Sequence, residues 1–301
     1  MLIWVYIFLF MIMSGCTYQK HQLPVAINGV LDLTNWKFDQ HGPIRLDGEW
    51  EFYWKELYAP QDFESTRRPE MTGLTQLPNY WSNLTIDGQQ LPGTGYATYR
   101  LKILLDQPSQ IRSLKIDHMM TAYQLWINEK MVAKNGEIGK DASEVVAEYL
   151  PQVSSFYADQ SEVQVIIQVS NFDHNEGGVW GKITLGNQDQ IRSMRERSMA
   201  FELVLTGTFL IMCLYHFGLY ILRRKDPSTL YFGMLCLVLT LRIMSTGEIL
   251  LVYFFEMPWY LLLKVEYLTF YLGVPLMILF CLLYTSPSPR DLSTSRMPSS
   301  A

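Results

Sequence analysis

The fold of the first two thirds of the chain is indicated most clearly by the stretch Glu162-Val163-Gln164-Val165-Ile166-Ile167-Gln168-Val169. Every second residue from Val163 to Val169 is Val or Ile, and the residues between them are Gln, Ile and Gln. Alternation with a period of two is typical of a β-strand that buries one face. Runs of this kind, separated by turn residues, recur from Ile44 to Leu185, where helical spacing is poor. The sequence therefore predicts an all-β sandwich in this region.

A predicted hairpin supports this architecture. Leu125-Trp126-Ile127 and Met131-Val132-Ala133 flank the turn Asn128-Glu129-Lys130, and two apolar runs around a short polar turn are a hairpin signal. Cysteine is absent between residues 17 and 198. A disulfide framework is therefore excluded for the sandwich, and its stability must come from a packed core.

The chain divides into a charged part and an apolar part. Of its 301 residues, 49% are hydrophobic and 18% are charged, with a formal net charge of −5. Residues 17–198 carry 23 acidic and 17 basic side chains, whereas residues 199–301 carry only 6 acidic and 7 basic ones. A mildly acidic, water-soluble domain is thus followed by a membrane-like segment. The lack of a basic stripe argues against nucleic acid as a partner.

The last third contains three predicted membrane spans. The charged segment 189–198 is a predicted helical stalk, and the apolar stretches that follow it are Met199–Leu222, Leu230 to about Ser245, and Trp259–Phe280. The basic stretch Arg223-Arg224-Lys225 follows the first span directly and is expected on the cytoplasmic side. This places the sandwich outside the cytoplasm, with the three helices running inward, outward and inward.

The N-terminus is a predicted export signal. Met1 to Met13 is an almost unbroken apolar run that is too short for a membrane span. It ends in Met13-Ser14-Gly15-Cys16, which resembles a bacterial lipobox, in which the cysteine is lipidated. The alternative is an ordinary signal peptide with an incidental cysteine. Either interpretation assigns residues 1–16 to a signal peptide and residues 17–188 to an exported sensor domain.

The order of several short motifs resembles a known architecture. Leu46-Asp47-Gly48-Glu49-Trp50-Glu51-Phe52 is followed by Leu77-Pro78-Asn79-Tyr80-Trp81, Gly95-Tyr96-Ala97-Thr98-Tyr99-Arg100, Leu125-Trp126-Ile127-Asn128 and Val169-Ser170-Asn171. This order is similar to the galactose-binding-like jelly roll in the sugar-binding domains of family-two glycosidases. It resembles still more closely the extracellular domain of bacterial seven-transmembrane receptors with diverse intracellular signalling modules, in which such a domain precedes a helix bundle.

The resemblance covers about residues 30–280 and implies the sensory part of a signal-transduction receptor in a bacterial inner membrane. The sandwich would bind a small ligand, with a sugar as the candidate, and residues 199–280 would be three helices of a truncated seven-helix bundle. Members of the family carry cyclase, histidine-kinase or phosphatase outputs after the bundle, and none is recognisable in these 301 residues. The alternative is a membrane-tethered carbohydrate-binding or assembly module without signalling. A homodimer is a candidate assembly.

The predicted ligand site consists of aromatic and polar residues of the sandwich. Aromatic side chains stack on sugar rings, and amide or carboxylate groups bind their hydroxyls. The loop from Asn171 to Trp180 holds polar groups and two glycines between two strands, where binding groups are common; a structural turn is equally compatible with its composition. The candidate ligand-binding residues are Trp81, Tyr96, Arg100, Asn171, Asp173, His174 and Trp180, and for the aromatic ones a core position is the alternative.

Catalytic and metal-binding patterns are missing from the sequence. It has no Gly-x-Ser-x-Gly elbow, no His-Glu-x-x-His pair, no phosphate loop and no paired Cys/His spacing for zinc. We therefore expect neither an enzyme nor a cofactor. His118 and His174 are isolated histidines, for which structural roles are the simpler interpretation.

Arg242 is the most informative polar residue of the predicted membrane region. A charge within a span is costly and usually faces a partner, and Glu248 and Glu266 are the candidates. The alternative is that the Arg242 side chain extends to the outer interface.

The C-terminal segment 281–301 is predicted to be non-native. Cys281–Asp291 match one reading frame of a transposase adapter used in sequencing libraries. The alternative is a real, disordered C-terminus, which many chains have.

Overall fold

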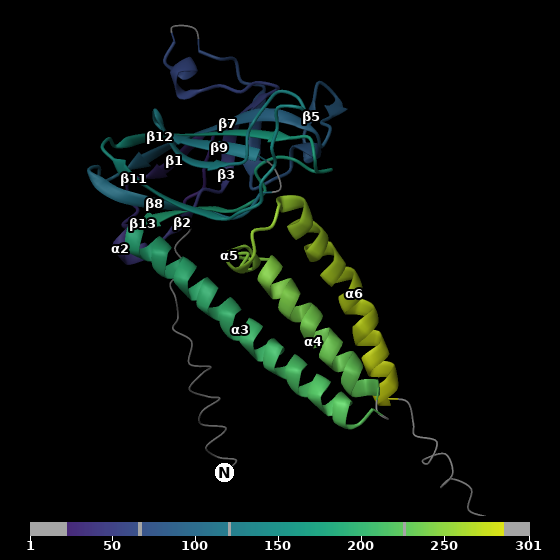
Figure 1. Cartoon of the computed structure of the whole chain (residues 1–301). Helices are drawn as coiled ribbons and strands as arrows, with labels where there is room; N and C mark the ends of the chain where they lie inside the picture. Colours follow the sequence, from purple (N-terminus) through teal and green to yellow (C-terminus); the bar gives the residue numbers. More distant parts are fainter. Residues whose placement is uncertain (1–22, 66–67, 120–121, 225–226, 286–301) are drawn as a thin grey trace, which may run out of the picture.

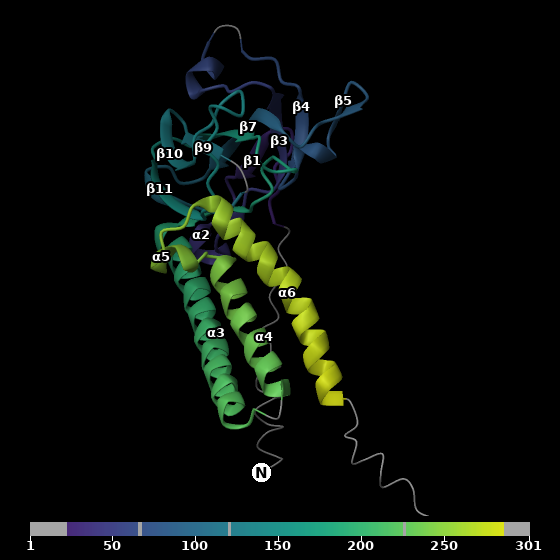
Figure 2. The same ribbon diagram turned by 45° about the vertical axis from the view of Figure 1, so that its right-hand side comes forward.

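The computed structural model describes residues 23–285, except for 66–67, 120–121 and 225–226. The predicted signal peptide with Cys16, and residues 286–301 of the predicted tail, lie outside the described residues. A β-sandwich forms one end of the molecule, and three long helices extend from it side by side (Figures 1 and 2). This confirms the predicted fold class, a β-sandwich followed by long apolar helices.

Two sheets make up the sandwich. The larger has the strand order β10-β9-β12-β7-β3-β4, with β1 parallel to one end of β7, and the smaller has the order β11-β8-β13-β2. The strands of the larger sheet are β1 (Val30–Leu33), β3 (Gly48–Trp54), β4 (Gly73–Leu77), β7 (Gly95–Leu105), β9 (Ala122–Ile127), β10 (Lys130–Asn135) and β12 (Glu162–Asn171). Those of the smaller are β2 (Ile44–Arg45), β8 (Gln110–Ile116), β11 (Gln152–Ala158) and β13 (Ile183–Asn187).

Short elements decorate the connections of the sandwich. They are the helix α2 (Phe38–His41), the 3-10 turns η1 (Pro60–Phe63) and η2 (Trp81–Asn83), and the small hairpin of β5 (Thr85–Ile86) and β6 (Gln89–Gln90). The predicted hairpin is β9–β10, and its turn is Asn128-Glu129. Asn128 has a φ of 51°, a left-handed conformation that asparagine tolerates better than most residues.

Strand β12 contains the alternating stretch from Glu162 to Val169 and lies inside the larger sheet. It pairs antiparallel with β7 on one side and with β9 on the other. Val163, Val165, Ile167 and Val169 are buried in the core between the sheets. Ile166 points to the opposite face, where it is buried against Tyr53 and Phe63 in a second, smaller cluster. The extra isoleucine in the alternation therefore marks a strand that is covered on both faces.

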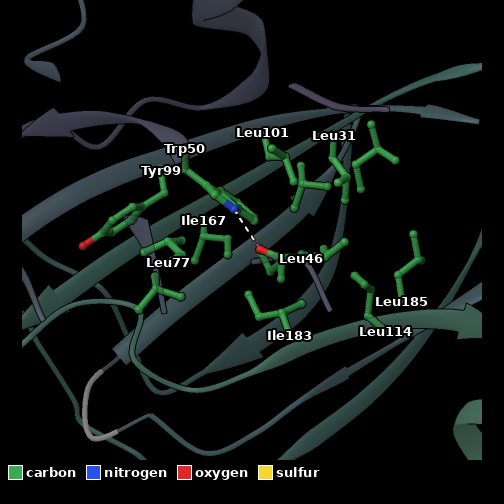
Figure 3. Close-up of a cluster of buried hydrophobic side chains, with 14 of the residues drawn as sticks. Leu31, Leu46, Trp50, Leu77, Tyr99, Leu101, Leu114, Ile167, Ile183 and Leu185 are labelled. Carbon is green, nitrogen blue, oxygen red and sulfur yellow. Dashed lines mark hydrogen bonds between the residues drawn. The ribbon is translucent and has the colours of Figure 1, made fainter. Parts of the chain in front are cut away.

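The core fills the space between the two sheets. Leu31, Trp50, Tyr99, Leu101 and Ile167 come from the larger sheet, and Leu114, Ile183 and Leu185 come from the smaller one (Figure 3). The indole Nε1–H of Trp50 donates to the carbonyl oxygen of Leu46 at 3.0 Å (Figure 3). The only polar side-chain atom of this fully buried residue is therefore satisfied inside the core.

The predicted stalk and first span form one continuous helix, α3 (Gln188–Leu222), which begins directly after β13. At about 1.5 Å per residue its 35 residues extend roughly 52 Å, whereas the hydrocarbon layer is about 30 Å thick. The helix is therefore longer than a membrane span requires, and its polar N-terminal turns lie next to the sandwich. They are fastened there because Gln190 Nε2 donates to the carbonyl oxygen of Phe38.

Two further long helices follow α3. They are α4 (Pro227–Ser245) and α6 (Trp259–Thr285), with the short helix α5 (Leu251–Phe254) between them. Length and composition make all three long helices candidates for crossing a membrane. Large apolar side chains face outward along them, among them Phe201, Leu214, Ile221, Phe270 and Tyr271, which gives a surface suited to lipid.

Candidate functional site

Asn171, the last residue of β12, fixes the shape of the loop from Asn171 to Trp180, which we call the rim loop. Asn171 is buried, its Nδ2 donates to the carbonyl oxygens of Gly93 and His174 at 2.8 Å each, and its Oδ1 accepts from the His174 backbone N–H at 3.0 Å. The Nδ1 atom of His174 lies 3.0 Å from the carbonyl oxygen of Glu176. The loop therefore uses Asn171 and His174 for its own shape, while Asp173 is exposed to solvent.

Trp81 forms the platform beneath this loop. It is fully buried, and its Nε1–H donates to the carbonyl oxygen of Gly93 at 2.9 Å. A Cβ atom on Gly177 would lie 2.3 Å from the Trp81 ring, so only glycine allows the loop to approach so closely. Trp81 thus has the core position that was the alternative to sugar stacking.

Arg100 lies away from the rim loop. On β7 it is five residues from Gly95, which pairs with Asn171, a separation of about 17 Å along a strand. Its guanidinium forms an ion pair with Glu51 at 2.8 Å and donates to Gln164 Oε1. The structure therefore does not bring Arg100 together with the other candidates, although Tyr96, half-buried on the same strand, pairs with Ser170 beside the loop.

Trp180, at the end of the loop, contacts the junction between the sandwich and the helices. Its ring centroid lies 5.8 Å from that of Tyr80 and 5.5 Å from that of His118, and His118 lies 4.6 Å from Tyr149. The Trp180 Nε1 atom is buried and has no hydrogen-bond partner within the described part of the chain. The loop thus extends from solvent at Asp173 to the junction at Trp180.

A charge cluster joins the smaller sheet to the helices. Lys115, at the end of β8, forms ion pairs with Asp117 at 2.9 Å and with Glu248, in the turn between α4 and α5, at 3.0 Å. Burial by itself lowers the pKa of Lys115, but the two carboxylates outweigh burial and raise it. Lys115 is therefore firmly cationic, and it ties the sandwich to the helical part.

Glu248 also binds helix α3. Only 3% of this residue is exposed, and its Oε2 lies 3.5 Å from Arg195 Nε. Its backbone N–H donates to the Glu202 carboxylate at 3.1 Å, and Arg195 donates from Nη2 to the Tyr253 hydroxyl at 2.5 Å. One buried carboxylate therefore connects the sandwich, α3 and the α4–α5 turn.

A second contact joins the sandwich to α6. The Tyr149 hydroxyl donates to Glu266 Oε2 at 3.3 Å, and burial first, then Glu266, raises the pKa of Tyr149. Arg242 donates to the Glu266 carbonyl oxygen at 2.7 Å and lies 3.8 Å from its carboxylate. Glu266 is thus the partner of Arg242, whereas Glu248, the other candidate, is bound to Lys115 and Arg195.

Four residues of the junction are not among the predicted site residues: Lys115, Asp117, Arg195 and Tyr149. Each looks like an ordinary solvated residue of a strand end, a loop or a stalk, and no spacing signal links them to Glu248 or Glu266. Within the described ranges, no group of three or more His, Cys, Asp or Glu side chains is placed to hold a metal ion. The charged groups of this arrangement face one another across the contact between the sandwich and the helices.

The fold and the junction define a membrane protein whose β-sandwich is fixed to long apolar helices. Residues 198–298 match the family described as 7TM diverse intracellular signalling. The match confirms the resemblance to membrane signalling receptors, and it extends over residues 281–298 of the predicted tail.

No curated protein matches the chain. Three solved glycosidase structures are similar to 48% of it. They are a GH2 β-galacturonidase of Eisenbergiella tayi bound to galacturonate (14% identity, TM-score 0.33), a β-glucuronidase of Faecalibacterium prausnitzii (13%, 0.35) and a β-glucuronidase of an uncultured Clostridium (17%, 0.35). The chain covers 24%, 31% and 29% of their respective lengths, less than a third of each.

Proposed function

We propose that this chain is the sensory part of a receptor in a bacterial inner membrane, with the sandwich outside the cytoplasm. The sandwich binds a small ligand, with a carbohydrate as the candidate, at the loop that contains Asp173 and Trp180. Binding changes the position of the sandwich relative to the helices, and an output domain responds to that change. Such a mechanism requires the ligand to bind two states of the junction with different affinities.

The observation that carries this proposal is the position of Glu248. It is buried, and its carboxylate lies 3.0 Å from Lys115 of the sandwich and 3.5 Å from Arg195 of α3. Losing one partner of a buried ion pair is costly. A shift of the sandwich would therefore change the contacts of Glu248 at α3 and at the α4–α5 turn. The rim loop reaches the same junction through Trp180 and His118.

The backbone next to Glu248 supports a junction with two states. Ile249 has a φ of 55° and is fully buried. A β-branched residue in this conformation is strained by about 1–3 kcal/mol, and strain of this kind concentrates at switches and binding sites. Packing against Tyr149 and Leu262 holds Ile249 in place, so movement of the sandwich away from α6 would release it.

The test uses the full chain in lipid nanodiscs and a panel of neutral and acidic mono- and disaccharides. Hydrogen exchange is followed in the rim loop, residues 171–180, and in the junction turn, residues 246–255. A binding saccharide should slow exchange in the loop and change it in the turn. In Glu248→Gln, the same saccharide should still protect the loop while its effect on the turn is reduced.

Two results would contradict the proposal. If a saccharide protects the loop and leaves residues 246–255 unchanged, the chain is better described as a tethered binding module. If no member of the panel protects the loop, the carbohydrate assignment is wrong.

A further inference from the structure

A groove lies between the sandwich and the connection from α5 to α6. Its volume is about 760 Å³, within the range of about 300–1,000 Å³ that is usual for small-molecule sites. One wall is the β10–β11 connection of the sandwich and the other is the segment from α5 into the first turn of α6. Its apolar lining includes Val146, Tyr149, Val252, Met257, Trp259 and Leu262. We call it the junction groove.

The floor of the junction groove is already built. Tyr149 and Leu262 are 2% and 1% exposed, and they belong to one buried cluster with Ile249 and Leu251. Val252, Met257 and Trp259 pack against that cluster. A ligand would therefore meet a formed apolar surface and would not have to assemble it, which lowers the entropic cost of binding.

The rim of the groove carries excess negative charge. Its ionisable residues other than Tyr149 are Lys134, Glu137, Glu148 and Glu256, a formal sum of −2. Lys134 is paired with Glu137 at 2.5 Å. Glu148 accepts the Gly136 N–H at 3.0 Å, and neither Glu148 nor Glu256 has an ion-pair partner among the residues that the structure describes. Two carboxylates thus remain without a neutralising cation.

We propose that the junction groove binds a cationic amphiphile, an apolar or aromatic body with a protonated amine. The body lies on the floor beside Tyr149 and Trp259, and the amine lies near Glu148 and Glu256. The charge excludes acidic ligands, because a carboxylate would face two others without a partner. This site is separate from the rim loop at Asp173.

The site also bears on signalling, and this step alone rests on the proposed receptor function. Tyr149 lines the groove and donates to Glu266 of α6, which holds Arg242 of α4. An occupant would touch both the sandwich and α6. It would therefore shift the equilibrium between the two proposed states of the junction. An amine ligand could then modulate a response that begins at the rim loop.

The test compares three probes with the same body: 4-phenylbutylamine, 4-phenylbutan-1-ol and 4-phenylbutyrate. Binding to the full chain in phosphatidylcholine nanodiscs is measured by calorimetry, with empty nanodiscs subtracted. The amine should bind at least about tenfold more tightly than the carboxylate, with the alcohol between them, since two uncompensated carboxylates favour one charge and disfavour the other.

Variants locate the binding. Val146→Trp fills the groove from an exposed position on the sandwich, so it should abolish binding without unfolding the chain. Glu256→Gln should weaken the amine about threefold, the size expected for one exposed ion pair, and leave the alcohol unchanged. Glu129→Gln, an exposed acid on the β9–β10 turn away from the groove, is the matched control and should change nothing.

Equal affinities for the three probes, or an amine affinity that both groove variants leave unchanged, would overturn the proposal. Absence of amine binding would also overturn it. None of these results depends on whether a saccharide binds the rim loop, so failure of this site and failure of the receptor function can be told apart.

Discussion

Replacing Glu248 with Gln should loosen the junction without unfolding the sandwich. Glutamine keeps the shape of the side chain but removes the charge shared by Lys115 at 3.0 Å and Arg195 at 3.5 Å. Breaking a buried ion pair usually costs about 3–5 kcal/mol. Here the cost should be lower, about 2 kcal/mol, because Lys115 keeps Asp117 at 2.9 Å and Arg195 keeps the Tyr253 hydroxyl.

Hydrogen exchange measures this loss of stability in the junction turn itself, residues 246–255. A loss of about 2 kcal/mol from local opening corresponds to roughly thirtyfold faster exchange in residues 246–255, whereas strands β7 and β12 should exchange as in the wild type. Glu162→Gln is the matched control, since its pair with Lys102 at 2.7 Å is partly exposed and is worth at most about 1 kcal/mol. Unchanged exchange in the turn, or uniform acceleration across the sandwich, would show that Glu248 does not stabilise the junction in this way.

Three further predictions concern topology, the rim loop and pH. An alkaline-phosphatase fusion after Asn187 should be active in a bacterial host and one after Asp226 inactive, because the proposed topology places only the first outside the cytoplasm; activity at both would refute that topology. Asp173→Ala should weaken the binding of a saccharide by about 1–3 kcal/mol in calorimetry and leave hydrogen exchange in the junction turn unchanged. Trp180→Ala should weaken binding and also speed exchange in that turn. If the two variants have the same effect on exchange in the turn, the loop is not coupled to the junction through Trp180. Burial lowers the pKa of His118 below its ordinary value of about 6.5, so the unfolded chain binds this proton more readily than the folded one. The contribution of His118 to the free energy of unfolding should therefore be fully present above about pH 6.5 and be lost as pH falls through the lowered pKa. Thermal unfolding of His118→Gln should lack this part of the pH dependence. An unchanged pH profile in the variant would contradict the prediction.

The sequence predicted those parts of the fold that depend on local periodicity. The alternation in β12, the turn at Asn128 and the three apolar stretches each follow from spacing alone, and the structure has all of them. Periodicity could not show whether the stalk and the first span are one helix or two, because the helical period is the same in a polar segment and in the apolar segment that follows it. The result is the single helix α3.

The candidate site was harder to predict, since it depends on contacts between distant segments. Trp81 and Asn171 have side chains typical of sugar sites, but a buried aromatic platform and a loop-closing amide need the same residue types. Lys115 and Glu248 are far apart in the sequence, and no motif or spacing links one to the other. Arg242 was recognisable because a charge in an apolar stretch demands a partner, and one of its two candidates, Glu266, is that partner.

A double-mutant cycle on Lys115 and Glu248 shows whether this contact couples the sandwich to the helices. The variants Lys115→Met, Glu248→Gln and their combination are compared by the opening free energy of residues 246–255 from hydrogen exchange. We expect a coupling energy of about 1–2 kcal/mol, within the range for residues in direct contact. Strictly additive effects, with a coupling energy near zero, would contradict it.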